Sequence, residues 1–179
     1  MSNSIDKLAT EIGRNRTAPV HLWKPDHEGS IEIRIDSKGD WYYRESFIQR
    51  PELVALFASV LLCEDDRYFL ITPVEKLQIE VEDVPFIIVD MDIHNEHDIQ
   101  HLALTTNVGD RIIVGPQNPI EVRYQKTSDT DIPYVLVRAN LYARVNRAVY
   151  YRMVDACVEI EGFHGISSGG QFFPLVQAS

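Results

Sequence analysis

The sequence has few cysteines and no long apolar run. Only two of its 179 residues are cysteines, Cys63 and Cys157, and each lies in an apolar periodic stretch. That setting is typical of buried free thiols in a reducing compartment. No stretch approaches the roughly 20 apolar residues of a membrane-spanning helix, and the segment Ser2–Val20 lacks the apolar core of a secretory signal. We therefore expect a cytoplasmic protein with no membrane partner.

Basic residues are also scarce. The chain has 17 Lys and Arg residues against 27 Asp and Glu residues, which gives a net charge of -10. Because neutralising backbone phosphates dominates affinity for nucleic acids, this balance argues against a nucleic-acid partner. One interval is the exception, since no carboxylate occurs between Asp131 and Asp155. This arginine–tyrosine interval contains four residues of each type: Arg138, Arg144, Arg147, Arg152, Tyr134, Tyr142, Tyr150 and Tyr151.

The arginine–tyrosine interval has two interpretations. A guanidinium group pairs with phosphate or carboxylate through a planar fork, and a tyrosine adds a ring face and a hydroxyl group. Together they suit a small anionic, partly aromatic ligand such as a nucleotide. Alternatively, these arginines neutralise the protein's own carboxylates. The sequence leaves both interpretations open.

Motifs for cofactors and catalysis are missing. The chain has no G-x-G-x-x-G after a strand, no phosphate-binding P-loop and no C-x-x-C pair, so no cofactor is predicted. The segment Gly165–Gly169 matches the G-x-S-x-G pattern of hydrolases, but no histidine follows it. We interpret it as a loop of small residues. The backbone N–H groups of Gly169 and Gly170 remain candidates for holding an anion.

Histidines and carboxylates cluster between residues 90 and 101. His94 and His97 are close enough in sequence to share a metal ion, with His101 nearby, but they do not form an H-E-x-x-H helix. We therefore predict no metal ligand there and expect a polar linker near residues 94–100.

Hydrophobic periodicity predicts a strand-rich chain with three helices. One helix is expected near Ile5–Ile12, a second from Pro51 to Leu61, and a third over residues 146–160. The third would place Arg147 and Tyr151 on one face, with Arg144 just before it. The expected strands are 31–36, 41–43, 68–72, 77–81, 86–93 and 120–124.

The second half resembles a diverged copy of the first. Gly109-Asp110 matches Gly39-Asp40, and Tyr134-Val135-Leu136 matches Tyr68-Phe69-Leu70. The predicted organisation is an N-terminal segment, 1–20, and two α+β halves that share an interface, 21–96 and 97–179. The predicted fold class is α+β.

Several blocks resemble a bacterial family of unknown function, numbered 1285. They include Trp23-Lys24-Pro25, Arg50–Phe57, Tyr68–Lys76, Arg147–Tyr151 and Ser168–Leu175. The resemblance implies a duplicated α+β core whose C-terminal half is similar to a pleckstrin-homology fold, in keeping with the C-terminal helix expected over 146–160. It also implies a ligand site between the halves and a role in signalling, with no established activity.

The resemblance carries over five candidate binding residues: Lys76, Arg147, Tyr151, Gly169 and Gly170. Arg144 joins them from the arginine–tyrosine interval. The leading hypothesis is a binding or sensor protein for a nucleotide-like anion. A protein–protein interaction module is the alternative. An enzyme acting on a phosphorylated substrate, with Glu75 or Asp155 as base, is less favoured because neither residue has a recognisable catalytic partner. The oligomeric state is not predicted.

Overall fold

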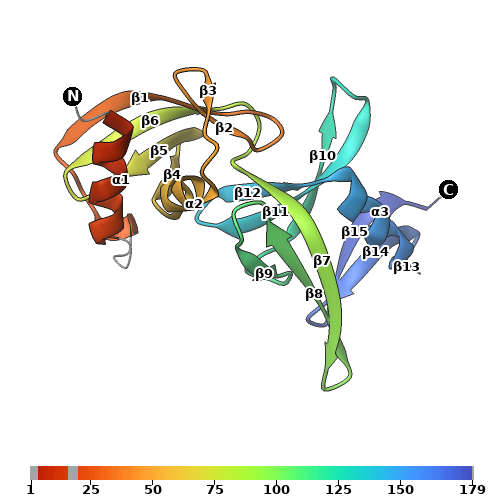
Figure 1. Ribbon diagram of the computed structural model, residues 1–179. Helices are drawn as coiled ribbons and strands as arrows, with labels where there is room; N and C mark the ends of the chain where they lie inside the picture. Colours follow the sequence, from red (N-terminus) through yellow and green to blue (C-terminus); the bar gives the residue numbers. More distant parts are fainter. Residues whose placement is uncertain (1–3, 16–19, 179) are drawn as a thin grey trace. The chain divides into compact units, whose positions relative to one another are not determined.

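The computed structural model describes residues 4–15 and 20–178, and the chain forms two compact units. The first unit is Met1–Pro85 and the second is Phe86–Ser179. Each contains its own six-stranded sheet (Figure 1). Among the described residues, no helix has the length and apolarity needed to cross a membrane.

The described residues of the first unit form six strands, two α-helices and one 3-10 turn. Its elements are α1 (Ser4–Asn15), η1 (Val20–Leu22), β1 (His27–Ile35), β2 (Trp41–Tyr43), β3 (Ser46–Phe47), α2 (Pro51–Ser59), β4 (Leu61–Glu64), β5 (Arg67–Ile71) and β6 (Glu75–Val81). The strand order is β3-β2-β1-β6-β5-β4, in which only the central β1–β6 pair is parallel.

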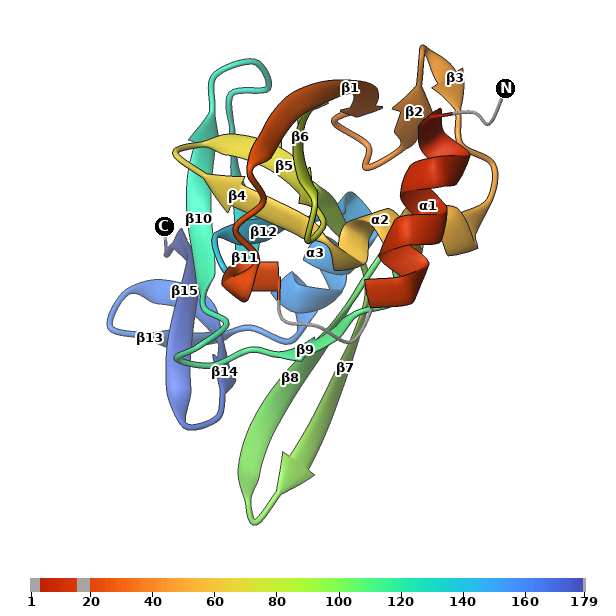
Figure 2. The ribbon, with the colours of Figure 1, turned by 90° about the vertical axis from the view of Figure 1, so that its left-hand side faces the viewer.

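The core of the first unit forms where apolar faces of the sheet and helices meet. Trp41 and Phe57 are buried and stack with their ring centroids 6.3 Å apart. Helix α1, which contacts α2 (Figure 2), buries the three residues whose spacing predicted it. These are Ile5, Leu8 and Ile12.

Helix α2 is shorter than the sequence predicted. It ends at Ser59, and Leu61 already belongs to strand β4. The carbonyl of Val60 accepts a hydrogen bond from the Ile71 N–H group, 3.1 Å away. Pairing with β5 therefore takes these residues out of the helix, although their spacing continues its apolar stripe.

The β4–β5 hairpin gives a test of its turn conformation. Asp65 and Asp66 connect the strands with φ angles of 49° and 59°, a region that favours glycine. Replacing Asp66 with glycine is expected to raise the free energy of unfolding by about 0.5–1 kcal/mol in urea denaturation. Asp66→Ala removes the same charge but keeps a Cβ, so equal stabilisation by both variants would contradict this explanation.

The second unit contains nine strands and one α-helix. Its elements are β7 (Phe86–Glu96), β8 (Ile99–Thr106), β9 (Arg111–Ile113), β10 (Ile120–Gln125), β11 (Thr130–Arg138), β12 (Leu141–Val145), α3 (Arg147–Asp155), β13 (Val158–Ile160), β14 (Phe163–Ser168) and β15 (Gln171–Gln177). The six-stranded sheet has the order β10-β11-β12-β7-β8-β9, and β13, β14 and β15 form a separate small sheet.

The two large sheets have the same topology. Read from its other edge, the second sheet is β9-β8-β7-β12-β11-β10, which matches β3-β2-β1-β6-β5-β4 strand for strand. In both, one central parallel pair is flanked by antiparallel strands. The predicted duplication is therefore confirmed. The α+β description is only partly right, because the described residues are mostly β with three α-helices.

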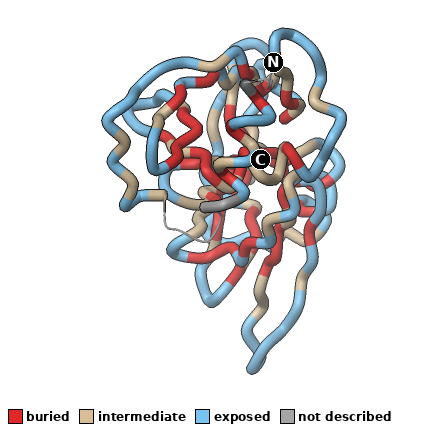
Figure 3. The backbone as a smooth tube through the Cα atoms, turned by 60° about the vertical axis from the view of Figure 1, so that its left-hand side comes forward, coloured by how far each residue is buried: buried red, intermediate tan, exposed pale blue. Residues whose placement is uncertain are grey.

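Two predictions for the second unit were wrong. The helix expected over 146–160 ends at Asp155, because Val158–Ile160 pairs with β14 as strand β13. No C-terminal helix follows, since the described chain ends in β15. The linker expected near residues 94–100 is instead the tip of the β7–β8 hairpin, whose outer end is exposed (Figure 3). The division between units falls before it, at Pro85 and Phe86.

The histidine cluster forms a cross-strand pair on that hairpin. His94 lies directly opposite His101, and their rings stack with centroids 5.5 Å apart. Within residues 4–15 and 20–178, no group of three or more His, Cys, Asp or Glu side chains is arranged to hold a metal ion.

The G-x-S-x-G match lies on strand β14 and the turn after it. Its central Ser167 pairs across the sheet with Phe172. The next residue, Ser168, is fully buried, accepts a hydrogen bond from the Leu102 N–H group (2.9 Å) and donates one to the Val114 carbonyl (2.6 Å). These contacts fasten the small sheet to β8, which gives this segment a structural role.

Candidate functional site

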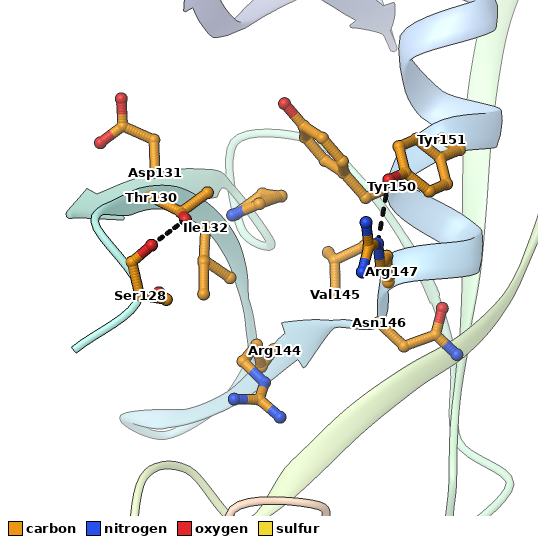
Figure 4. Close-up of a pocket in the computed structure, with 11 residues that line it drawn as sticks. Ser128, Thr130, Asp131, Ile132, Arg144, Val145, Asn146, Arg147, Tyr150 and Tyr151 are labelled. Atoms are coloured by element: carbon orange, nitrogen blue, oxygen red, sulfur yellow. Dashed lines mark hydrogen bonds between the residues drawn. The ribbon is translucent and has the colours of Figure 1, made fainter. Parts of the chain in front are cut away.

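A pocket of about 480 Å³ lies in the second unit, between the start of β11 and the junction of β12 with α3 (Figure 4). Its volume is within the range usual for small-molecule sites. The lining residues all belong to this unit: Ser128, Thr130, Asp131, Ile132, Pro133, Arg144, Val145, Asn146, Arg147, Tyr150 and Tyr151. Three of the sequence-predicted binding residues are therefore brought together, namely Arg144, Arg147 and Tyr151.

The local sequence explains how these side chains are positioned. Asn146 caps helix α3, because its side-chain oxygen accepts a hydrogen bond from the Val149 N–H group at 2.8 Å. The cap starts the helix at Arg147, beside the end of β12. Arg147 and Tyr151 are four residues apart and so lie one turn apart on the same face. Tyr150 extends from α3 over the pocket toward β11 (Figure 4).

The Arg147 guanidinium group is oriented by a phenol. Its Nε donates to the Tyr151 hydroxyl at 2.9 Å, and the guanidinium carbon lies 5.6 Å from the centre of the tyrosine ring. In the part of the chain that the structure describes, no carboxylate pairs with Arg147. Both side chains are exposed, so the positive charge of Arg147 is accessible at the pocket.

Two other arginines of the interval neutralise carboxylates of the protein. Arg138 contacts Asp110 at 3.1 Å, and Arg152 contacts Asp90 at 2.6 Å. Arg152 also donates to the Met91 carbonyl at 2.6 Å. Arg138 and Arg152 therefore neutralise carboxylates of the protein, as one interpretation of the sequence expected, and Arg144 and Arg147 line the pocket.

The Asp90–Arg152 pair leads to a prediction about pH. The hydrogen bond from Arg152 lowers the pKa of Asp90 below its ordinary value, helped by the Met91 N–H group. The stability that the pair contributes is present above the ordinary pKa and is lost as the pH falls through the lowered one. We expect the pKa of Asp90, followed by NMR, to rise in Arg152→Gln. Arg111→Gln should raise the pKa of Asp90 less, because Arg111 acts on it only through a weaker charge effect. Equal rises in the two variants would contradict Arg152 as the main cause of the lowered pKa.

Lys76 is not an unpaired cation. It lies in β6 of the first unit, where its ammonium group contacts both Glu64 and Glu28. The hydrogen bond to Glu64 raises the pKa of Lys76 above its ordinary value. The lysine also lies 4.4 Å from the centre of the Phe69 ring. These contacts account for its charge within its own unit.

Gly169 and Gly170 form the tight turn between β14 and β15, with φ angles of 60° and 78°. Neither residue lines the pocket. The Gly169 N–H group donates to the Gln100 carbonyl at 2.8 Å, so it is already used within the protein. The glycines therefore serve the turn geometry, and the structure gives no anion cradle at Gly169.

A wider hollow of about 820 Å³ occurs in the first unit, where the β1–β6 register shifts between Ser30 and Arg34. Its two arginines are both ion-paired. Arg34 contacts Glu45 (3.2 Å) and Glu82 (2.7 Å), and Arg44 contacts Glu32 (2.8 Å). This hollow is therefore a weaker candidate for an anionic ligand than the pocket beside α3.

The β11 side of the pocket was missed from the sequence. Ser128, Thr130 and Ile132 show no motif, and they meet α3 only because β11 and β12 pair in register. The one available signal was Asp131, which marks the start of the carboxylate-free interval. Glu75 and Asp155, considered as catalytic bases, do not line this pocket.

Fold and site together define a β-rich protein of two topologically matched sheets, with an arginine–tyrosine pocket in the second unit. The comparisons with known proteins agree with the division into two units. Residues 18–84 match the N-terminal domain of the family of unknown function DUF1285, and residues 85–175 match its C-terminal domain. The chain belongs to the DUF1285 family.

Two solved structures of this family are similar to the chain. The DUF1285 protein from Silicibacter pomeroyi DSS-3 is 40% identical, with a TM-score of 0.91 over 99% of this chain and 97% of that chain. The DUF1285 protein from Shewanella baltica OS155 is 32% identical, with a TM-score of 0.56 over 70% of this chain and 91% of that chain. No curated protein shows a significant match.

Proposed function

We propose that this protein binds a small anionic ligand carrying an aromatic ring, of the nucleotide type, in the pocket beside α3. The observation that carries the proposal is the guanidinium group of Arg147, which bonds to the Tyr151 hydroxyl at the pocket and to no carboxylate of the described chain. A cation kept accessible in a protein of net charge -10 is suited to an external anion.

The surroundings of Arg147 favour an anion with a flat group attached. The N-terminus of α3 adds the positive end of the helix dipole at the pocket. Arg144 supplies a second guanidinium group, and Tyr150 and Tyr151 supply ring faces. The Asp131 side chain points away from both arginines (Figure 4), so its charge is directed away from a bound phosphate.

The broader role follows from this site as part of the proposal. Binding at the pocket would favour one conformation of the protein over another, and this shift would transmit a signal.

The thiols of Cys63 and Cys157 are both free, in keeping with a reducing cytoplasm. A pleckstrin-homology-like character of the second unit is also part of the proposal, supported by its many strands and by α3 packing on β7.

A thermal-shift screen tests the proposal. The panel contains nucleotides, cyclic dinucleotides and dinucleotide cofactors at low and moderate salt. A ligand at about 100 times its dissociation constant stabilises the native state by about 2.7 kcal/mol. We expect selective stabilisation by ligands that carry both phosphate and base. Equal stabilisation by inorganic phosphate would mean that the site recognises phosphate alone. No shift in melting temperature with any ligand at millimolar concentration would contradict the proposal.

A further inference from the structure

The small sheet β13-β14-β15 has one apolar face that is exposed. Direct cross-strand pairs place Ile160 beside Phe163, and Val158 beside Gly165, on the same face. Three of these residues are apolar and exposed: Ile160 (42%), Phe163 (42%) and Val158 (50%). Pro174, opposite Gly165, continues the face and is exposed as well.

The other face of this sheet is covered. Ile166, Phe173 and Leu175 are buried, and Ser168 bonds to the backbone of β8 and of Val114. The sheet therefore already packs against the core of its unit through one face. The exposed apolar residues belong to the opposite face and contribute nothing to that core.

Strand β13 also forms a free edge of the sheet. It is the terminal strand in the order β13-β14-β15, and all three of its residues are exposed. In an antiparallel pair, hydrogen-bonded positions alternate along the strand. Ile160 and Phe163 flank the two-residue turn and so exchange hydrogen bonds, which leaves the N–H and C=O groups of Glu159 pointing outward.

The segment that forms this sheet carries acidic residues and no Lys or Arg. No lysine or arginine occurs from Met153 to Ser179, whereas Asp155, Glu159 and Glu161 lie in or beside β13. An anionic membrane or a nucleic acid would be repelled by these carboxylates. Antiparallel pairing with a second copy centred on Glu159 would place two glutamates directly opposite each other, which is unfavourable.

We infer that the β13 edge binds an extended segment of a partner protein in which apolar and basic residues alternate. Such a segment adds a strand next to β13 by pairing with the outward groups of Glu159. Its apolar side chains then lie beside Val158 and Ile160, and its basic side chains lie beside Glu159 and Glu161. The edge geometry, the exposed apolar residues, and the acidic residues Glu159 and Glu161 all favour this partner chemistry.

Fluorescence anisotropy with the full chain tests the inference. The probe is a labelled peptide of about seven residues in which valine alternates with lysine, a usual length for one strand. A second peptide has the same composition in blocks, without alternation. We expect the alternating peptide to bind and the block peptide to bind at least about tenfold more weakly, because only alternation matches the two faces of a strand. Equal binding would reduce the interaction to general charge attraction and overturn the inference.

Variants at Glu159 separate charge from backbone pairing. Glu159→Lys should weaken binding of the alternating peptide by roughly tenfold or more. Glu52→Lys makes the same charge change at an exposed residue of α2 and should leave the affinity nearly unchanged. Glu159→Gln keeps the outward N–H group and Glu159→Pro removes it, a substitution that edge strands tolerate. The proline variant should bind more weakly than the glutamine variant, with both folded by circular dichroism. Equal affinity of the proline and glutamine variants for the alternating peptide would contradict binding at this edge. Unchanged affinity in Glu159→Lys would contradict it as well.

Discussion

Replacing Arg147 with glutamate is expected to weaken binding of the nucleotide that most stabilises the wild-type protein by about 100-fold, equivalent to about 2.7 kcal/mol. The variant loses charge-assisted hydrogen bonds to the phosphate and places a like charge beside it. The fold should persist, because the Arg147 side chain is exposed and its Nε bonds only to the Tyr151 hydroxyl in the described chain. Isothermal titration calorimetry measures the affinity, and thermal unfolding without ligand checks the fold.

A matched variant controls for net charge. Lys38 is exposed in the β1–β2 turn of the first unit and does not line the pocket, so Lys38→Glu makes the same charge change without altering a pocket residue. We expect its affinity for the nucleotide to stay within about threefold of wild type, since the pocket residues are unchanged and salt screens exposed charges. Similar losses of affinity in both variants would mean that the ligand responds to the overall charge of the protein. That result would contradict the assignment of the pocket as the binding site.

Replacing Gly165 with alanine is expected to destabilise the second unit by about 3 kcal/mol. The added Cβ would lie 2.3 Å from the Phe173 carbonyl oxygen and 2.8 Å from the Pro174 Cα, which are backbone atoms. Backbone in the middle of the β14–β15 pair cannot move aside as the end of a flexible side chain can. Strand packing therefore requires the first glycine of the G-x-S-x-G match.

Amide hydrogen exchange is the measurement for Gly165→Ala. Both tryptophans, Trp23 and Trp41, belong to the first unit, so tryptophan fluorescence does not report directly on the second. Exchange at Ile166 and Phe173 reports on the small sheet itself. Gly115→Ala is the control, because nothing lies within 4 Å of its added Cβ; it should change stability by less than about 0.5 kcal/mol. Unchanged protection in Gly165→Ala would contradict the packing argument.

Sequence periodicity predicted six of the strands, which correspond to β1, β2, β5, β6, β7 and β10, and matching segments predicted the duplication. Periodicity failed where helix and strand pairing competed for the same residues. Val60 and Leu61 continue the apolar stripe of α2, and Ile160 continues that of α3, but each lies in or next to a strand in the structure. The spacing of apolar residues along the sequence does not show whether a neighbouring strand is available for pairing. The Gly-Asp turns were also misleading in detail, since Gly39 joins β1 to β2 whereas Gly109 joins β8 to β9, strands that are not topological equivalents.

The candidate site was predictable only on its helical side. The interval free of carboxylates pointed to Arg144, Arg147 and Tyr151, because charge pattern and helical spacing are local properties of a sequence. The residues of β11 that complete the pocket depend on sheet register, which the sequence does not show. The family resemblance pointed to Lys76 and Gly169, and the small-residue motif had also pointed to Gly169. Their bonding partners, Glu64 and Gln100, are distant in sequence.

The most direct test of the central claim is an NMR titration of the wild-type protein with the nucleotide selected by the thermal-shift screen. Binding in the pocket should perturb the amide signals of Arg144, Arg147 and Tyr151 together and in a saturable way, because all three line one cavity. The Lys76 amide should change little. Saturable perturbations confined to other residues, with these three signals unmoved, would contradict the assignment of this pocket as the ligand site.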